Sequence, residues 1–513
     1  MSTHTADRAP LLRLGPTRAI ARRSGAVRSA LALAVAAFGC SQVLAVENGA
    51  AGTIVGAALV ALAAPLARGR RRALLATAGL VLASLALDDD VIALPGLAAV
   101  ALLAASLVTA PAFRASGDPA TRRLIVPAAA LLAIGLIADL ARAFGHLAHP
   151  LGATLLAGAC LFAARALRPW RSGASDDPEA RAHAAQIVAQ HATDTLAPFT
   201  LRADKQFFFA VSGDSFIAYR VLAGVALVSG DPVGDEAAFP ALVEAFARFA
   251  ERRGWTVGVL GVSAQRLPLW RDAGLRAHYT GDEAIVDPSA FSLEGRAIRK
   301  VRQSVTRLER AGYSAQAVHS GEIDEALAER IAEIAARWRG DAGETGYSMA
   351  FAGATVDRTR DDLYVIARDD SGEPRGFLHF GTVPGGRALS LSSMRRDRDT
   401  PNGLNEFLIC RVLEYAREHG IERVSLNFAA FALLDPPAPL DPLSRAERRV
   451  LGRLAKRFQL ERLLSFSQKF EPEWKPRYAA YPSVATLPRI ALAAMLAEAY
   501  LTLPSAPWRG RRA

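Results

Sequence analysis

Residues that support several common kinds of catalysis are scarce in this sequence. Its 513 residues include three cysteines, Cys40, Cys160 and Cys410, which lie too far apart to suggest a disulfide framework or a zinc site. No Ser/His/Asp triad and no cysteine nucleophile is apparent, and we interpret His379 and His419 as structural. The sequence therefore predicts neither a metal site nor a covalent catalytic centre.

Lysine is also scarce, because only five of the 61 basic residues are lysines. The formal net charge is +11, and a basic excess suits nucleic acid or anionic lipid head groups as partners. However, a strong preference for arginine is typical of a GC-rich genome, so the total charge alone identifies no partner. The positions of the basic residues are more informative than their number.

Long apolar segments are abundant in the first third of the chain. A membrane-spanning helix needs roughly 20 mostly apolar residues. Six segments approach this length: roughly Ser29–Val46, Ala50–Ala67, Ala73–Leu87, Val91–Ala110, Leu124–Phe144 and Leu151–Leu167. We therefore expect a membrane domain of about six transmembrane helices at residues 29–170, with the third span the shortest.

The loops between these segments alternate in charge. Arginines occupy the N-terminal residues 1–28, the loops after the second and fourth spans, and the end of the sixth span. Acidic residues follow the first and third spans. Because positive residues stay on the cytoplasmic side, we expect a multi-pass plasma-membrane protein with both termini inside. The long basic stretch before the first span argues against a cleavable signal peptide.

The residues after a polar linker at 171–180 have the mixed composition of a soluble α/β domain, up to a basic tail at 504–513. Periodicity indicates two lobes, at about 181–290 and about 312–503, with one order of elements. Lobe one is predicted to contain strands Phe207–Val211, Phe216–Val221 and Val225–Ser229, helix Phe239–Arg253, strand Trp255–Leu260, helix Leu267–Ala273 and strand Ala284–Val286. Lobe two is predicted to contain helix Ile323–Arg339, strands Leu363–Arg368, Phe377–Gly381 and Ala388–Ser393, helix Leu404–His419 and strand Arg423–Asn427. This is the layout of acyltransferases of the N-acetyltransferase type, so two such lobes in tandem are expected in the cytoplasm.

Acetyl-coenzyme A enzymes of that type usually hold the pyrophosphate in a glycine-rich turn that opens the central helix. The corresponding turn here, Asp399–Gly403, has one glycine instead of the usual pair. This counts against coenzyme A, and no cofactor is expected. The helix N-terminus remains suited to another anion, such as a phosphodiester.

A strongly basic segment separates the two lobes at about 292–311. If Ser292–Ala311 is one helix, its basic residues cluster on one face and its apolar residues on the opposite face. The basic face comprises Arg296, Arg299, Lys300, Arg307 and Arg310. Such a row matches a phosphate backbone, which makes these residues candidates for tRNA binding. The alternative is a solvated helix in an arginine-rich chain.

Several stretches together resemble the C-terminal domain of the lysylphosphatidylglycerol synthase family, also called multiple peptide resistance factor, and actinobacterial members look most similar. They are VALVSGDPVGDE at Val225–Glu236, RKVRQSVTRLERAGY at Arg299–Tyr313, SLSSMRRDRDTPNGLNEFLI at Ser390–Ile409, RVSLNFAAF at Arg423–Phe431 and KFEPEWKPRYAAYP at Lys469–Pro482. They occur in the family's order and cover about residues 200–490.

This resemblance implies a tandem acyltransferase fold, an aminoacyl-tRNA donor and phosphatidylglycerol as the acceptor, with lysine as the most expected amino acid. The product would be a cationic lipid that lowers surface negative charge and weakens cationic antimicrobial peptides. Alternatives are an acyltransferase with another acceptor, a lipid transporter or flippase whose cytoplasmic domain only regulates, and an inactive homologue. Full-length relatives often have a larger membrane region than six spans.

Four lobe-two residues are candidates for catalysis of this ester exchange. Glu406, in the first turn of the central helix, is a candidate base or ammonium ligand, although such an acid also complements a helix dipole. Arg395 is a candidate ligand for a phosphate or the carbonyl group, and Asn427 for the aminoacyl group. Ser392 stands where the family usually has an acid, which suggests a different amino acid or reduced activity.

The segment Lys469–Tyr478 combines cations with aromatic residues, a pattern that suits a lipid head group or the tRNA acceptor end. The candidates are Lys469, Trp474, Lys475, Arg477 and Tyr478. The alternative is a packed loop that Pro472 and Pro476 hold in shape. Asp231, in the SGDPVG turn, is interpreted as a turn-capping residue.

Overall fold

The structure is a computed structural model, and it describes residues 17–44, 49–87, 94–115, 130, 177–340, 346–351, 355–385, 387–430 and 460–501. The predicted fifth and sixth spans, most of the predicted linker and the basic tail lie outside these residues. The chain forms two compact units, which are mainly the helices up to Arg171 and the domain that begins at Ser172.

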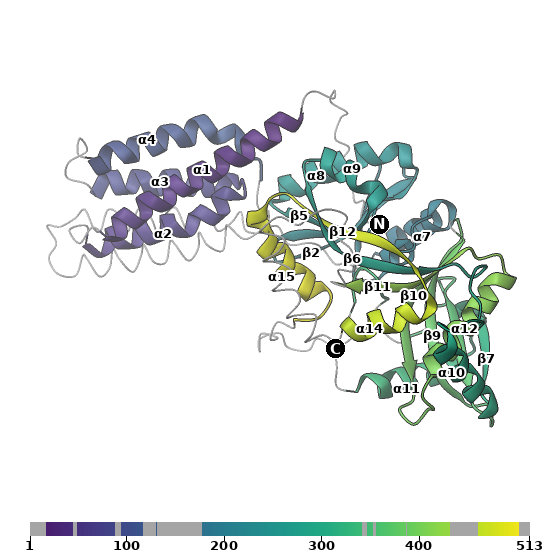
Figure 1. Ribbon diagram of the computed structural model, residues 1–513. Coiled ribbons are helices and arrows are strands. Elements are labelled where there is room, and N and C mark those ends of the chain that lie inside the picture. The colour runs from purple at the N-terminus through teal and green to yellow at the C-terminus, as the bar shows by residue number, and fades with distance from the viewer. Residues whose placement is uncertain are drawn as a thin grey trace. The chain divides into compact units, whose positions relative to one another are not determined.

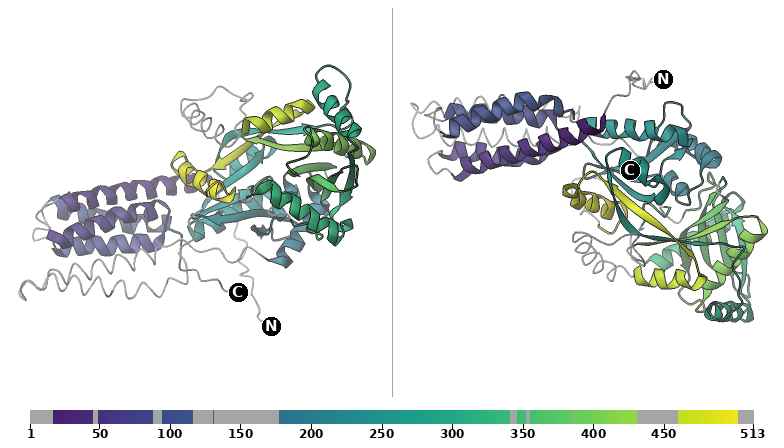
Figure 2. Two further views of the ribbon diagram at one scale, coloured as in Figure 1. Left: turned by 90° about the horizontal axis from the view of Figure 1, so that it is seen from below. Right: turned by 45° about the horizontal axis from the view of Figure 1, so that its top comes forward.

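Helices make up the described part of the first unit. They are α1 (Thr17–Leu44), α2 (Gly49–Ala67), α3 (Arg71–Leu87), α4 (Leu94–Thr109) and a short 3-10 turn, η2 (Ala110–Ala112). The long helices lie side by side (Figures 1 and 2). A Cβ on Gly39 of α1 would lie 2.7 Å from the carbonyl oxygen of Gly56 of α2, so only glycine permits this approach. Small residues at helix crossings are typical of packed membrane helices.

Two of the described helices are long and apolar enough to cross a membrane, at Gly25–Leu44 and Leu94–Ala112. They correspond to the first and fourth predicted spans. The second and third predicted spans are also helical, but the apolar stretch Gly52–Ala67 is shorter and α3 has 17 residues. A domain of six spans therefore stays a prediction from the sequence.

The second unit is built on one mixed sheet, which has twelve strands in the described part of the chain. These are β1 (Gln206–Phe209), β2 (Ser215–Leu222), β3 (Val225–Ser229), β4 (Val233–Gly234), β5 (Thr256–Ser263), β6 (Arg276–Val286), β7 (Ser314–His319), β8 (Leu363–Arg368), β9 (Pro374–Val383), β10 (Ala388–Arg396), β11 (Arg423–Ala430) and β12 (Glu473–Tyr481). Their order is β1-β2-β3-β5-β12-β6-β11-β10-β9-β8-β7, and β4 pairs with β2. The helices are α7 (Pro178–His191), α8 (Phe239–Arg253), α9 (Leu267–Asp272), α10 (Arg299–Arg310), α11 (Glu325–Arg339), α12 (Leu404–Glu418), α14 (Leu460–Ser467) and α15 (Leu487–Ala497).

The two halves of this sheet repeat one order of elements, which confirms the predicted α/β class. In lobe one, β1, β2 and β3 are antiparallel, α8 follows, and β5 runs parallel to β3. In lobe two, β7 to β10 are antiparallel, α12 follows, and β11 runs parallel to β10. The bounds of β3, α8 and β8 are those expected from the sequence.

Helices α10 and α12 cover the core of lobe two. Val301 and Leu308 of α10 and Phe407 of α12 belong to one buried cluster with residues of the sheet. Gly403 precedes α12 with a φ of 99°, and a Cβ there would lie 2.6 Å from the Cβ of Ser304. The basic segment between the lobes therefore packs directly on the start of the central helix.

The C-terminal strand β12 lies between β5 and β6 and pairs antiparallel with both. Figure 1 shows it in yellow, crossing between these two teal strands. Helix α15 then packs on lobe one, where Ile490 contacts Gly258 of β5. Residues that the sequence assigned to the end of lobe two thus complete the sheet of lobe one, and Glu473–Tyr481 is a strand rather than a loop.

Candidate active site

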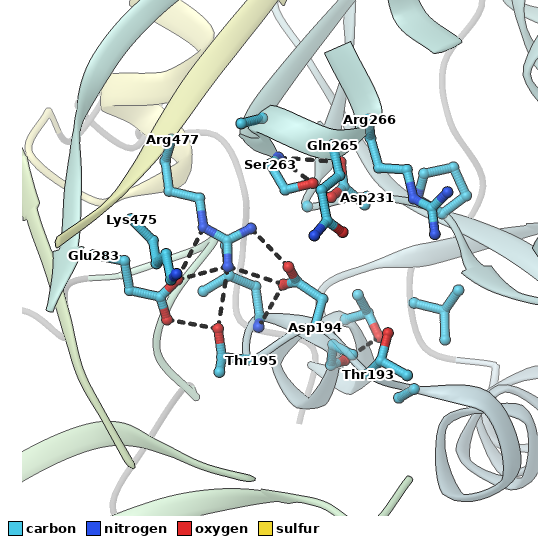
Figure 3. A pocket seen from close by; sticks show the side chains of 18 of the residues that line it. Thr193, Asp194, Thr195, Asp231, Ser263, Gln265, Arg266, Glu283, Lys475 and Arg477 are labelled. Carbon is cyan, nitrogen blue, oxygen red and sulfur yellow. Dashed lines mark hydrogen bonds and ion pairs between the residues drawn. The ribbon is translucent and has the colours of Figure 1, made fainter. Parts of the chain in front are cut away.

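A cavity of about 510 Å³ opens where the parallel strands β3 and β5 end. Its walls come from both lobes: the segment from His191 to η5 (Ala197–Leu201), the turn after β3, the end of β5, and residues of β6, β12 and β11. The carboxyl ends of parallel strands are a usual place for ligands in α/β sheets, and this volume is typical of small-molecule sites. Figure 3 shows charged side chains converging there.

Arg477, on β12, lines this cavity and is 4% exposed. Its Nη1 donates to the Asp194 carboxylate at 2.8 Å, and its Nη2 donates to the Glu283 carboxylate at 2.6 Å (Figure 3). Burial alone would lower the pKa of Arg477, but the charges of Asp194 and Glu283 outweigh burial and raise it. The guanidinium is therefore a permanent cation held between two carboxylates.

Glu283, on β6, is fully buried and connects this ion pair to lobe two. Its Oε1 accepts hydrogen bonds from the hydroxyls of Thr195 at 2.6 Å and Ser425 at 2.5 Å. Ser425 Oγ in turn accepts the backbone N–H of Asn427 at 3.2 Å. Because both oxygens of Glu283 have donors, the buried carboxylate is satisfied and fixes β6, β11 and β12 relative to one another.

Asp231 follows β3 in a turn that Gly230 enters with a φ of 74°, and the Asp231 side chain lines the cavity. Among the described residues, its hydrogen-bond donors all belong to Ser263, whose backbone nitrogen lies 3.2 and 3.4 Å from the two carboxylate oxygens. Burial, followed by the negative charge of Asp194, raises the pKa of Asp231 to about 7, although Arg477 opposes this. A carboxyl that titrates near neutrality inside a cavity is a candidate functional group.

Ser392 and Asn427, both expected to contact substrate, instead hold one segment of backbone. Ser392 Oγ accepts the N–H of Phe351 at 3.0 Å, and Asn427 Nδ2 donates to the carbonyl of Met349 at 2.8 Å. Asn427 has a φ of 77°, in the left-handed region that asparagine tolerates better than most residues. Both residues lie at irregularities of their strands, where side chains are free to bond to backbone. The structure thus brings these two candidates together around residues 346–351.

Glu406 and Lys469, predicted for different roles, form an ion pair. Glu406 lies in the first turn of α12, and Lys469 Nζ donates to its Oε1 at 2.7 Å. Both side chains remain partly exposed, so substrate can reach the pair. Arg395 is half-buried near the end of β10, the strand that carries Ser392.

The basic helix is shorter than predicted but has the predicted faces. It begins at Arg299 rather than near Ser292, because the Arg302 guanidinium donates to the carbonyls of Leu293 and Gly295 and folds the preceding residues into a turn. Arg296 therefore lies before the helix. The apolar face is buried, as expected, and the predicted basic residues are all exposed: Arg296, Arg299, Lys300, Arg307 and Arg310.

The candidates on β12 were expected to bind a lipid head group or the tRNA acceptor end, but the structure buries some of them. Tyr478 is buried and packs edge-on against Tyr279, and Trp474 packs against the core of lobe two. Arg477 and Tyr478 are buried in β12, a central strand of the sheet, so their binding to a lipid head group or the tRNA acceptor end stays a prediction. Lys475 is half-exposed, forms an ion pair with Glu473 and lines the cavity beside Arg477.

Two residues central to the cavity, Asp194 and Glu283, were missed in the sequence. Asp194 lies in the connection after α7 with no recognisable motif around it. Glu283 follows Asp282 in β6 and directly precedes the apolar residues Ala284–Val286, and an acid bordering that apolar run was the available signal. Asp231 was noticed, but its raised pKa depends on burial and on the charge of Asp194, neither of which the local sequence shows.

Fold and cavity together define an α/β domain of the acyltransferase type. Residues 185–481, more than half of the chain, match the family described as "Phosphatidylglycerol lysyltransferase, C-terminal", and the chain belongs to this family. The resemblance inferred from the sequence stretches is thereby confirmed.

Curated relatives carry names related to this family. The chain is 40% identical over 315 residues to the lysylphosphatidylglycerol biosynthesis bifunctional protein LysX of Mycobacterium tuberculosis strain H37Rv, which covers 61% of this chain and 27% of that protein. The Mycobacterium marinum protein of the same name is 39% identical over 316 residues, covering 61% and 28%. The matched region thus spans about a quarter of the length of these relatives.

Two solved structures share the fold. One is the C-terminal domain of a putative lysylphosphatidylglycerol synthetase from Agrobacterium fabrum, with a TM-score of 0.54, 26% identity, and coverage of 62% of this chain and 96% of that one. The other is L-PGS from Bacillus licheniformis, with a TM-score of 0.56, 22% identity, and coverage of 64% and 98%.

Proposed function

We propose that this chain transfers an aminoacyl group, with lysine as the first expectation, from aminoacyl-tRNA to phosphatidylglycerol at the cytoplasmic face of the plasma membrane. Membership of the phosphatidylglycerol lysyltransferase family over residues 185–481 carries the proposal. The two described helices able to cross a membrane support a site close to the lipid. The cationic product would lower surface negative charge and favour resistance to cationic peptides.

The reaction is an ester exchange. A glycerol hydroxyl of the lipid attacks the aminoacyl ester carbonyl, its proton passes to a base, and the ribose oxygen of the tRNA leaves and takes up a proton. The ester is already activated, so the site must supply orientation, a proton acceptor and a cation near the developing oxyanion. In this proposal Glu406 accepts the proton, and Lys469 and Arg395 supply positive charge.

Ser392 and Asn427 are proposed as positioning residues. Their hydrogen bonds fix the backbone of residues 346–351, so they act through that segment. The family's acid at position 392 would offer the same kind of acceptor to the Phe351 N–H. A serine there is therefore compatible with an active enzyme.

In this proposal, the basic helix α10 delivers the donor RNA to this site. Arg299, Lys300 and Arg310 are exposed on α10. Arg307 donates to the carbonyl of Asn402 at 3.0 Å, in the turn that opens α12 one turn before Glu406. Phosphates bound along α10 would therefore bring an acceptor end close to Glu406, with Arg296 extending the basic surface before the helix.

The test is lipid synthesis by the purified full chain in vesicles. The chain in phosphatidylglycerol vesicles is mixed with lysyl-tRNA carrying radiolabelled lysine, and the lipid is extracted and counted. Label is expected in the lipid with lysyl-tRNA, but neither with free lysine and ATP nor in phosphatidylcholine vesicles. Glu406→Gln should abolish most of the transfer. Glu414→Gln, on the same helix and paired with Arg411, serves as the matched control.

Mass spectrometry of lipids from cells with and without the gene identifies the amino acid and the acceptor. Failure of the wild-type chain to label any lipid from several aminoacyl-tRNAs would contradict the proposal and favour a lipid transporter with a regulatory domain.

A further inference from the structure

Trp338, near the end of α11, is an exposed aromatic residue to which the proposed reaction gives no role. Its exposed fraction is 41%, and no other large apolar side chain is exposed among the described residues from 314 to 430. Ile334 and Ile331, one and two turns earlier on the same face of α11, are fully buried. An exposed indole at this position therefore departs from the pattern of its own helix.

An arginine from another element faces this ring. The guanidinium carbon of Arg396, at the end of β10, lies 6.0 Å from the centroid of the Trp338 ring, at the outer limit of a cation–π contact. Arg396 Nη1 also donates to Thr400 Oγ1 at 2.8 Å and to the Thr400 carbonyl at 3.3 Å. The turn before α12 thus fixes this guanidinium beside the indole, and we call Trp338 and Arg396 the tryptophan platform.

The acids beside the tryptophan platform are already paired. Asp397 and Asp399 alternate with Arg396 and Arg398 along the chain, but arginines from other elements contact both carboxylates. Among the described residues, Arg396 and Arg398 therefore have no carboxylate partner, and Arg398 is exposed. The arginines that contact these two acids, and also Glu333 and Asp369, are Arg330, Arg337 and Arg375.

The tryptophan platform adjoins the basic helix already proposed to bind RNA. Arg307 of α10 donates to the carbonyl of Asn402 at 3.0 Å, and Arg396 Nη1 donates to the carbonyl of Pro401 at 3.5 Å. The two basic surfaces therefore bond to adjacent residues of one turn. This turn opens α12 just before Glu406, so an RNA strand that runs from α10 toward Glu406 would pass the platform.

We propose that the exposed Trp338 ring stacks with one unpaired base of the tRNA acceptor end, while Arg396 and Arg398 neutralise the adjoining phosphates. The inference rests on the proposed function, which supplies the RNA. The amino acid is esterified to an unpaired 3′ end, and stacking on an aromatic ring holds such a base without reading its identity. Helix α10 would bind the paired stem through phosphates, and the platform would hold the end that reaches Glu406.

A lipid head group fits the tryptophan platform less well. Interfacial aromatic residues bind a bilayer together with further apolar side chains. Trp338 is isolated in this respect, because the described residues from 314 to 430 expose no second large apolar side chain. A nucleic-acid base needs one flat ring and a cation for the next phosphate, which the platform offers.

The experiment measures binding of uncharged lysine tRNA to the purified full chain in detergent by filter binding. Trp338→Leu keeps an apolar side chain without a ring, and Trp338→Tyr is the matched control that keeps one. We expect Trp338→Leu to weaken binding roughly fivefold to a hundredfold, the range for loss of one stacked base, and Trp338→Tyr to stay within about twofold of the wild type. A tRNA that lacks its unpaired 3′ end should bind the wild type and Trp338→Leu equally.

A fluorescent base reports the same contact in the wild type itself. 2-Aminopurine loses fluorescence when it stacks on an aromatic ring, and it is placed at each position of the unpaired 3′ end in turn. At one position the emission should fall when the wild type or Trp338→Tyr is added, and it should fall less with Trp338→Leu. The position that depends on the ring identifies the stacked base.

Equal binding of intact tRNA by the wild type and Trp338→Leu would overturn the inference. So would an equal loss for intact and truncated tRNA, or a 2-aminopurine signal that does not depend on the ring at any position. A raised KM for phosphatidylglycerol in Trp338→Leu with unchanged tRNA binding would assign the platform to the lipid instead.

These measurements separate the inference from the proposed function, because binding of uncharged tRNA requires no transfer. Binding of the 3′ end that depends on Trp338 would support the platform even if no lipid were labelled. Labelled lipid together with tRNA binding that ignores Trp338 would refute the platform and leave the proposed function standing.

Discussion

Replacing Asp231 by asparagine is expected to stabilise the protein, and increasingly so as the pH rises from 4 to 8. The folded protein raises the pKa of Asp231 to about 7, through burial and the charge of Asp194, against the opposing charge of Arg477. The unfolded chain returns it to roughly 3.9. Asparagine has no charge and keeps an oxygen for the Ser263 N–H, so it avoids the cost of ionising a buried acid.

The sign and size of the effect follow from proton linkage. Between about pH 4 and pH 7, the folded state holds a proton that the unfolded state has released. The free energy of unfolding of the wild type therefore falls as pH rises, by about 1.4 kcal/mol per pH unit. Over about three units the loss reaches roughly 4 kcal/mol, and it is complete above pH 7. Asp231→Asn should match the wild type near pH 4 and exceed it by roughly this amount at pH 8.

Thermal unfolding of the purified full chain in detergent measures this difference. Three of the six tryptophans, Trp270, Trp338 and Trp474, lie in the second unit, and their fluorescence reports its unfolding. At roughly 2 °C per kcal/mol for a large domain, Asp231→Asn should melt on the order of 5–10 °C above the wild type at pH 8 and at nearly the same temperature at pH 4.5. A difference in Tm that is constant across this range would refute the assignment of a raised pKa to Asp231.

Three further substitutions test the other parts of the site. Arg477→Met leaves two carboxylates without their buried cation and should lower the free energy of unfolding by about 3–5 kcal/mol. This loss appears as a lower unfolding midpoint in denaturant. An unchanged midpoint would mean that the ion pairs do not form. Glu406→Gln breaks the partly exposed ion pair with Lys469, which contributes about 1 kcal/mol or less to stability. The Tm should therefore barely change, while the transfer rate falls roughly a hundredfold or more. Parallel losses of Tm and transfer rate would instead indicate a structural role. Arg299→Gln combined with Lys300→Gln should weaken tRNA binding, as measured by filter binding. The slope of the logarithm of the binding constant against log salt concentration should become shallower by about 0.7–0.9 per lost phosphate contact. An unaltered slope would show that α10 is not part of the RNA interface.

The sequence predicted those elements whose signals are local. Helix α8 has its predicted bounds because Phe239, Leu242 and Phe246 recur at helical spacing and are buried together, and Gly254 ends the helix with a φ of 70°. The buried face of α10 was predicted for the same reason. Its start was not, because the left-handed Gly295 and the reach of a single arginine side chain leave no periodic pattern.

The sequence could not predict the elements whose environment comes from distant residues. A strand with Lys475, Pro476 and Arg477 looks like a surface loop when read alone. In the structure, Arg477 is neutralised by Asp194 and Glu283, which are 283 and 194 residues away along the chain. Because a buried charge is stable only with such partners, the burial of β12 depends on contacts that no local pattern records.

The hydrogen bonds also join residues that the sequence assigned to separate roles. The Asn427 N–H donates to Ser425, Ser425 donates to Glu283, and Glu283 accepts from Arg477. These hydrogen bonds connect residues 346–351, which Asn427 holds, to the cavity. The path crosses from β11 of lobe two through β6 to the inserted strand β12. The same network that orients the cavity walls therefore also positions the segment beside Ser392. The inserted strand β12, rather than either lobe alone, therefore holds the cavity and this segment together.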